Sequence, residues 1–162
     1  MGEVTLRAPQ SDDWAAILEL AELSLSEMHI VPSQQEWLNN RKSFSAADGL
    51  QQHFVATLGG RIAGYAGVEH RNGWADGVYR LFVVVAPPQR ATLGTRLLAR
   101  LRECLLTLGA RSAWFQELED DAHFNSYLEE MGFLKGRAFK LDDGISLVRL
   151  TIDAPFQSLV RV

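Results

Sequence analysis

The chain has 162 residues, of which 47% are hydrophobic, 22% charged and 9% aromatic. This composition is that of an ordinary globular protein and argues against a disordered or fibrous chain. A chain of this length buries about 70% of its unfolded surface. We therefore expect one domain over residues 1–162 that needs no disulfide or metal for stability.

The charge balance is slightly acidic, with 16 Lys and Arg against 20 Asp and Glu, a formal net charge of −4. The basic residues are scattered along the chain, which argues against binding of a nucleic-acid backbone. A mildly acidic surface gives a weak, salt-screened preference for cationic small substrates.

Other broad classes are also disfavoured. Cys104 is the only cysteine, so the chain has no internal disulfide and no zinc site with two or more thiolates, and the histidines lack ligand spacing. We predict no bound metal. The longest apolar run, residues 81–88, is far shorter than the ~20 residues of a membrane helix, and no secretory signal pattern is present. We expect a cytoplasmic protein that does not insert into membranes.

The first elements are predicted to be a strand and a helix. Residues 4–7 alternate like a strand, and the helix that follows has an apolar side made of Ile17, Leu18, Leu20, Ala21 and Leu25. The N-cap and the negative charge of the first turn would come from Ser11, Asp12 and Asp13. Residues 28–49 have a weak pattern in which Pro32 and Ser33 could begin a second helix.

A three-stranded antiparallel meander follows, over residues 53–58, 62–70 and 78–85. The Gly59-Gly60 pair and the Asn72-Gly73 pair separate these runs, and such pairs favour hairpin turns because they accept positive φ. The third run is apolar on both sides near its end, which predicts a central strand buried on both faces.

The second half alternates helices and strands. Helices are predicted over residues 92–108, closed by Gly109, and over residues 121–131, closed by Gly132. Strands are predicted over residues 110–118, 133–141 and 145–152. The unit over residues 79–119 has the length of a right-handed crossover between parallel neighbours, so we predict an α+β fold with a mixed sheet.

The junction between the central strand and the next helix is a candidate anion site. The first N–H groups of a helix have no intrahelical acceptor and lie at the positive end of its dipole. Gly94 would let the backbone approach a ligand closely. Alternatively, Gly94 relieves packing between the helix and the strand.

This junction resembles the acyl-CoA-binding motif of the GNAT superfamily of N-acyltransferases, Gln/Arg-x-x-Gly-x-Gly/Ala, with Gln89 first, Gly94 last and Thr92 in place of the earlier glycine. Leu6-Arg7 with Asp12-Asp13 resembles the family's opening, and residues 129–133 resemble its helix-Gly-Phe signature. The resemblance spans nearly the whole chain. It implies a mixed, mostly antiparallel sheet of six or seven strands, about four helices and a central splayed strand pair.

The resemblance also implies acetyl-CoA, or a related short acyl-CoA, as co-substrate. The pantetheine arm would pair with main-chain groups of Phe82, Val83 and Val84 along the splayed strand, as a short added strand would. The pyrophosphate would lie on main-chain N–H groups of Gln89, Arg90, Ala91, Thr92, Leu93, Gly94 and Thr95. The β-branch of Thr92 would narrow this cradle. Asn125 could face the cofactor.

Acyl transfer needs an amine without its proton, so a base is expected. The best-placed carboxylates are Glu69, Glu117 and Glu119, of which the last two are predicted to share a strand face. For each of them, a solvated strand end is the structural alternative.

The departing thiolate would profit from a proton donor, a tyrosine in this family. The position that usually holds it is Leu128, and Tyr127 is its neighbour, about 100° away around the helix. Tyr127 is the candidate acid, although it could face elsewhere. Cys104 repeats with Leu97, Leu101 and Leu108 and is interpreted as core.

The resemblance therefore implies direct transfer of an acetyl group to a primary amine of a small molecule or peptide. The alternative is a non-catalytic acyl-CoA-binding module of the same fold, and a third possibility is a plain structural domain. The apolar segment 156–160 could pack on its own sheet or on a partner's, and a homodimer is expected.

Overall fold

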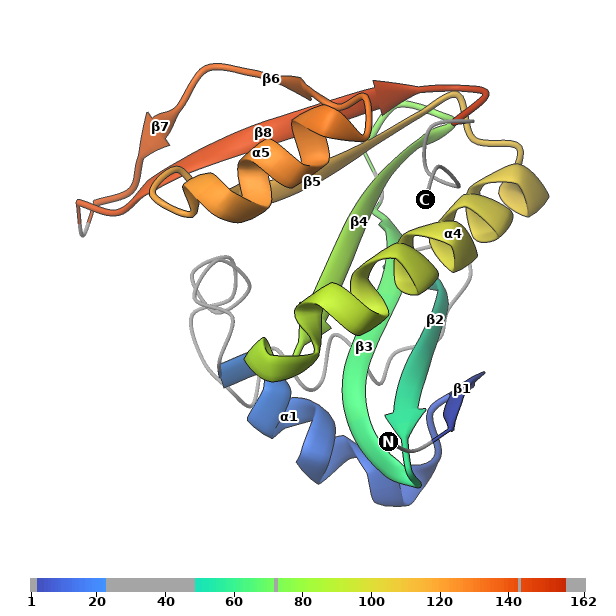
Figure 1. The fold of residues 1–162 in the computed structure, drawn as a ribbon. Helices are drawn as coiled ribbons and strands as arrows, with labels where there is room; N and C mark the ends of the chain where they lie inside the picture. Colours follow the sequence, from blue (N-terminus) through green and yellow to red (C-terminus); the bar gives the residue numbers. More distant parts are fainter. Residues whose placement is uncertain (1–2, 23–48, 72, 143, 157–162) are drawn as a thin grey trace.

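The computed structural model describes residues 3–22, 49–71, 73–142 and 144–156 (Figure 1). They form one 8-stranded sheet in the order β1-β2-β3-β4-β5-β8-β6, in which β7 pairs with β8. The strands are β1 Val4–Arg7, β2 Gly49–Leu58, β3 Arg61–His70, β4 Val78–Val85, β5 Ser112–Leu118, β6 Leu134–Lys135, β7 Phe139–Lys140 and β8 Ser146–Asp153. All pairs are antiparallel except β4 with β5. The α+β class, the meander and the parallel crossover are confirmed.

The sheet has more strands than the six or seven expected, because the run predicted over residues 133–141 is interrupted. Lys135 is opposite Leu150, whereas Phe139 is opposite Leu147, so an advance of four residues in the β6–β7 segment corresponds to three residues of β8. The extra residue leaves the ladder as a bulge, which divides the run into β6 and β7.

Three α-helices are described: α1 Trp14–Glu22, α4 Arg90–Leu108 and α5 Ala122–Glu130, with short 3-10 turns at Ser11–Asp13 and Pro87–Gln89. The helix expected near Pro32 lies outside the described residues. The predicted closure of α4 is confirmed, since Gly109 adopts φ 69° and its N–H reaches the carbonyls of Leu105 and Leu106. None of the helices in the described ranges is long and apolar enough to cross a membrane.

The helices cover opposite faces of the sheet, as the alternation of buried neighbours shows. Val55, Tyr65 and Phe82 pack with α1, whereas the next residues, Ala56, Ala66 and Leu81 on the paired strands, pack with α4. The α4 core includes Cys104, which is 2% exposed and whose thiol pKa is raised by burial. This confirms Cys104 as a core residue. β4 is buried on both faces, as predicted for the central strand.

The C-terminal segment begins by packing on its own chain. Phe156 is 1% exposed within the α4 core, and its carbonyl accepts a hydrogen bond of 3.0 Å from Nε of Arg102. The rest of the apolar segment, residues 157–160, lies outside the described residues, so the expected homodimer stays a prediction.

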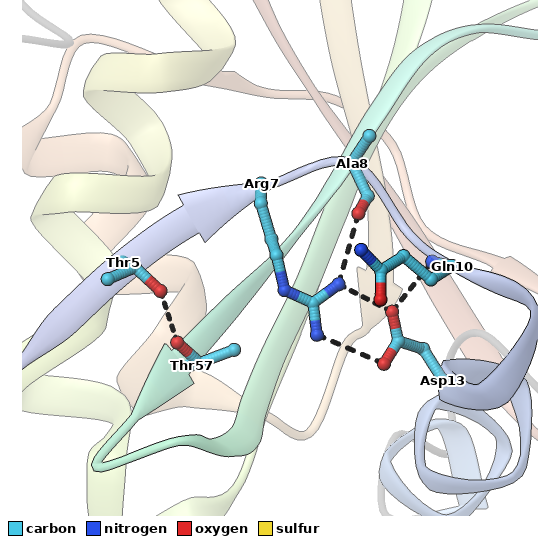
Figure 2. Close-up of polar contacts among 6 residues, drawn as sticks. All are labelled: Thr5, Arg7, Ala8, Gln10, Asp13 and Thr57. Atoms are coloured by element: carbon cyan, nitrogen blue, oxygen red, sulfur yellow. Dashed lines mark hydrogen bonds and ion pairs between the residues drawn. The ribbon is translucent and has the colours of Figure 1, made fainter.

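An ion pair joins the end of β1 to the start of α1 (Figure 2). Nη1 and Nη2 of Arg7 donate to the two carboxylate oxygens of Asp13 at 2.6 and 3.1 Å, and the backbone N–H of Gln10 donates to the same carboxylate at 2.7 Å. The prediction that residues 11–13 supply the N-cap was wrong, because Gln10 is the cap and Asp13 reaches back to it. The hydrogen bonds from Arg7 lower the pKa of Asp13 against the opposing effect of burial.

We predict that Asp13→Asn lowers the free energy of unfolding at pH 7 by about 1 kcal/mol, because it removes a two-pronged ion pair and half of a cap. A carboxyl whose pKa is lowered in the folded state stabilises the fold above its unfolded pKa, near 4, and this contribution is lost as the pH falls through the folded pKa. Urea unfolding at pH 7 and near pH 3 should show the difference shrinking. Asp12→Asn, at an exposed neighbour, is the control, and equal effects of both variants at pH 7 would contradict the assignment.

Candidate active site

The parallel ladder between β4 and β5 is short. It joins Val78 to Ser112, Tyr79 to Ala113 and Arg80 to Trp114, and then stops. Beyond this point β4 continues along β3, while β5 continues along β8. The two strands diverge visibly in Figure 1, with α4 beside one and α5 beside the other. The predicted splay of the central pair is therefore present next to residues 82–84, and we call this divergence of β4 from β5 the parting.

The start of α4 lies at the end of β4. After the 3-10 turn Pro87–Gln89, Gln89 is the N-cap of α4, and its side chain makes no cap hydrogen bond. No side chain in the described part of the chain caps this helix start. The N–H groups of the first turn thus have no side-chain acceptor among the described residues, and such groups at a helix start favour an anion. Thr92 lies inside the regular helix with an exposed side chain, so the expected distortion of the cradle by its β-branch is not seen.

Gly94 faces open space and the hydroxyl of Tyr127. A Cβ added at Gly94 would meet no atom closer than Oη of Tyr127, at 3.8 Å, which is ordinary van der Waals contact. Packing between the helix and the strand therefore does not require glycine, and that alternative is wrong. A glycine inside a helix costs about 1 kcal/mol relative to alanine, so its use here calls for another reason.

The same distance places Tyr127 of α5 beside the first turns of α4. Leu128, at the family's usual tyrosine position, is instead fully buried in the core. Tyr127 stacks on Phe124, with ring centroids 6.2 Å apart, and partial burial raises the pKa of its hydroxyl above the ordinary value near 10. The side chain thus reaches toward the first turns of α4.

Asn125 forms hydrogen bonds with the turn between β5 and α5. Its Nδ2 donates to the carbonyl of Leu118 at 3.0 Å and to that of Glu119 at 3.4 Å, and the residue is 2% exposed. Its Oδ1 is buried and has no hydrogen-bond partner among the residues that the structure describes. Asp121 is the N-cap of α5, and its side chain accepts a hydrogen bond of 3.3 Å from the backbone N–H of Phe124.

Glu69 lies at the end of β3 in a buried ion-pair cluster. Its Oε1 accepts from Nη1 of Arg80 at 3.2 Å and its Oε2 from Nη2 of Arg71 at 2.8 Å. Glu69 and Arg80 are each 2% exposed, so a solvated strand end is wrong for Glu69. Because both oxygens accept from guanidinium groups, taking up a proton would disturb these contacts, and Glu69 is poorly suited to act as a base.

Glu117 lies on the diverging part of β5, two positions after Phe115 and opposite Val148 of β8. It is 9% exposed, so it is no solvated strand end either. Glu119 is exposed and follows the end of β5 at Leu118, so only Glu117 of the two lies within the strand. Glu117 therefore lies on the part of β5 that no longer pairs with β4, whereas Glu119 lies beyond the strand.

An aromatic and cationic cluster was missed by the sequence analysis. Cζ of Arg149 lies 3.7 Å from the ring centroid of Trp114, and Cζ of Arg80 lies 6.0 Å from the same ring. Burial and the charge of Arg80 lower the pKa of Arg149. A signal was present in the sequence, because Arg149 interrupts the apolar run of β8.

Comparison with known proteins identifies the family of this chain. The acetyltransferase (GNAT) family matches residues 14–133. The chain belongs to this family. None of the curated proteins matches the sequence at a significant level.

Solved structures of other GNAT-fold proteins cover nearly the whole chain. The ribosomal-protein-S18-alanine N-acetyltransferase from Escherichia coli has a TM-score of 0.70 at 19% identity, covering 93% of this chain and 94% of that one. The yncA structure from Salmonella typhimurium with its cofactor acetyl-CoA has a TM-score of 0.68 at 18% identity, covering 93% of both chains. A mutant of the spermidine N-acetyltransferase SpeG from Vibrio cholerae has a TM-score of 0.72 at 17% identity, covering 95% of this chain and 96% of that one. At these identities the likeness shows the fold alone.

No group of three or more His, Cys, Asp or Glu side chains within the described ranges could hold a metal ion.

We predict that Gly94→Ala raises the free energy of unfolding by about 0.5–1 kcal/mol, because alanine favours the helix and its Cβ has room. Chemical denaturation of the protein without ligand measures this. A destabilised Gly94→Ala variant would mean that packing does require glycine here.

Proposed function

We propose that the protein transfers an acetyl or short acyl group from acetyl-CoA to a primary amine of a small molecule or peptide, directly, with both substrates bound. The observation that carries the proposal is the early end of the β4–β5 ladder beside a helix start that no side chain of the described residues caps. Membership of the GNAT family supports it. The yncA structure was solved with acetyl-CoA, which supports the choice of co-substrate.

The co-substrate, when bound, supplies an activated thioester. Main-chain N–H groups of residues 89–95 would hold its pyrophosphate, because the positive end of the α4 dipole favours an anion. Main-chain groups of Phe82, Val83 and Val84 would guide the pantetheine arm toward the parting. A small residue at position 94 leaves room for the ligand, which explains a glycine that packing does not need. A contact from Asn125 to the co-substrate stays a prediction.

Two side chains would act as the base and the acid of the reaction. Glu117, on the diverging part of β5, is proposed as the base that accepts the proton of the amine, directly or through water. Tyr127 is proposed as the acid that protonates the departing thiolate, since its hydroxyl lies beside the helix start that would hold the co-substrate. Glu69 is the less suitable base because it is engaged by two arginines. A cytoplasmic location stays a prediction.

Two features of the sequence favour a non-catalytic acyl-CoA-binding module: Thr92 in the cradle and Leu128 at the usual tyrosine position. The placement of Tyr127 beside Gly94 weakens the second reason. Binding and turnover measurements separate the two functions, because a module binds acetyl-CoA tightly and releases no free thiol with any amine.

We predict that saturating acetyl-CoA stabilises the protein by about 2–3 kcal/mol, seen as a rise in melting temperature. Gly94→Trp should abolish this rise because the indole fills the space in front of the helix start. Gly94→Ala is the matched control and should keep most of the rise, because one methyl group fills little of the space that the ligand needs. A Gly94→Trp variant that still responds to acetyl-CoA would place the binding site elsewhere.

We predict that Tyr127→Phe lowers kcat about 10- to 100-fold while the KM for acetyl-CoA changes little, since the hydroxyl acts in the chemical step. Because burial raises the pKa of Tyr127, the donor stays protonated, and no loss of rate from its ionisation is expected below pH 10. Steady-state kinetics between pH 6 and pH 10 tests both points. Tyr79→Phe, which removes a hydroxyl from β4, is the control. An unchanged kcat for Tyr127→Phe would exclude it as the acid.

A further inference from the structure

Arg149 presents a fixed guanidinium on the face of the sheet opposite α4. It is opposite Gln116 across the β5–β8 ladder, and Trp114 on the same strand shares that face. Trp114 is in turn opposite Arg80, and Phe82, two residues further along β4, packs with α1. These side chains therefore lie on the α1 face. The distance of 3.7 Å from Cζ of Arg149 to the ring centroid of Trp114 places the guanidinium over the indole.

The charge of Arg149 has no counterpart among the described residues. Arg7 pairs with Asp13, Arg100 with Glu103 and Arg71 with Glu69, whereas Arg149 makes no ion pair in the described part of the chain. The carboxylate in this cluster, that of Glu69, accepts from Arg71 and Arg80. Arg149 instead lies near the like charge of Arg80, on an indole that both guanidinium groups approach. A guanidinium held in this way offers its planar fork to an external carboxylate.

The position of Arg149 relates this charge to the reaction site. Gln116, its partner on β5, lies two positions after Trp114, the last residue of β5 that pairs with β4. Arg149 is therefore one strand away from the point where the parting opens. The helix start that would hold the co-substrate is on the α4 side, so the second substrate has the α1 face from which to approach. Glu117 shares the other face with Phe115, so the amine would reach it through the parting.

We propose that the acceptor amine carries an anionic group, the carboxylate of an amino acid, and that Arg149 binds this group. The amine would then be directed into the parting between β4 and β5. Trp114 acts as a positioning residue for the guanidinium. This inference rests on the proposed acyltransferase function for the role of the amine. It differs from the expectation drawn from the net charge of −4, since that balance describes the whole surface and not this cluster.

The test compares α- and ω-amino acids with their carboxamides, which keep the amine and lose the negative charge. Thiol release with acetyl-CoA gives kcat and KM for each pair. For the wild type, kcat/KM for the best amino acid should exceed that for its amide at least tenfold. Arg149→Gln should raise the KM for the amino acid about 10- to 100-fold, leave kcat nearly unchanged and leave the amide unaffected.

Two variants sharpen the test. Arg149→Glu should reverse the preference, so that the amide and diamines become better acceptors than the amino acid, which loss of structure alone would not produce. Arg61→Gln removes an equal charge at the exposed, opposite end of β3 and should behave as the wild type. Acetyl-CoA affinity, measured for every variant, reports that the fold is intact.

Failure of this inference is distinguishable from failure of the proposed function. If amino acids and amides are acetylated equally, or if Arg149→Gln changes nothing, the anionic subsite is wrong and the acyltransferase stands. If no amine is acetylated, the proposed function is wrong. Thermal shift with the same amino acids and amides then decides the subsite: a shift specific to amino acids that Arg149→Gln removes supports it, and its absence overturns it.

Discussion

The separation of β4 from β5 after Arg80 is the constraint on which the site depends. A parallel ladder that ended at the last residue of β4 would satisfy its main-chain groups and leave no place for a ligand arm. Here the ladder ends after Arg80 and Trp114, and each strand continues with a different partner. A substrate with amide groups can take the place of the missing strand, which makes the end of pairing a binding feature.

Separate helix packing holds the two halves of the sheet apart. Leu93, Leu97 and Leu101 of α4 are fully buried over the strands of the meander. On the other half, Phe115 of β5 lies 6.0 Å from Phe124 and 5.4 Å from Phe133, around α5. Each strand is thus fixed by its own helix and its own outer neighbour, so the parting does not need a ligand to persist.

The fold could be predicted from sequence where local chemistry decides it. Gly59 and Gly60 adopt positive φ, as the hairpin signal required, and Gly109 ends α4 in the left-handed region. The break between β6 and β7 could not be predicted, because the bulge is a property of register against β8 and not of residues 133–141 alone. Periodicity reports which residues are apolar, whereas register needs the partner strand.

The site was predictable in its backbone and much less so in its side chains. The position of residues 89–95 at a helix start follows from the order strand, turn, helix in the sequence. The burial of Glu69 depends on Arg80, which is distant in sequence and adjacent only through the β3–β4 register. Similarly, Arg149 meets Trp114 across a ladder whose existence the sequence suggests but whose register it does not specify.

Tyr127 illustrates how a core requirement can move a functional group by one residue. Two neighbouring helix positions differ by about 100°, so Leu128 and Tyr127 cannot both face the same surface. Leu128 and Met131 fill the space beneath α5, while Tyr127 emerges at the edge of the helix nearest α4. Because a tyrosine side chain is long, its hydroxyl can reach the edge of α5 nearest α4 from position 127 although the motif position is 128. A motif position therefore predicts the region in which a hydroxyl is needed, and packing then determines which residue provides it.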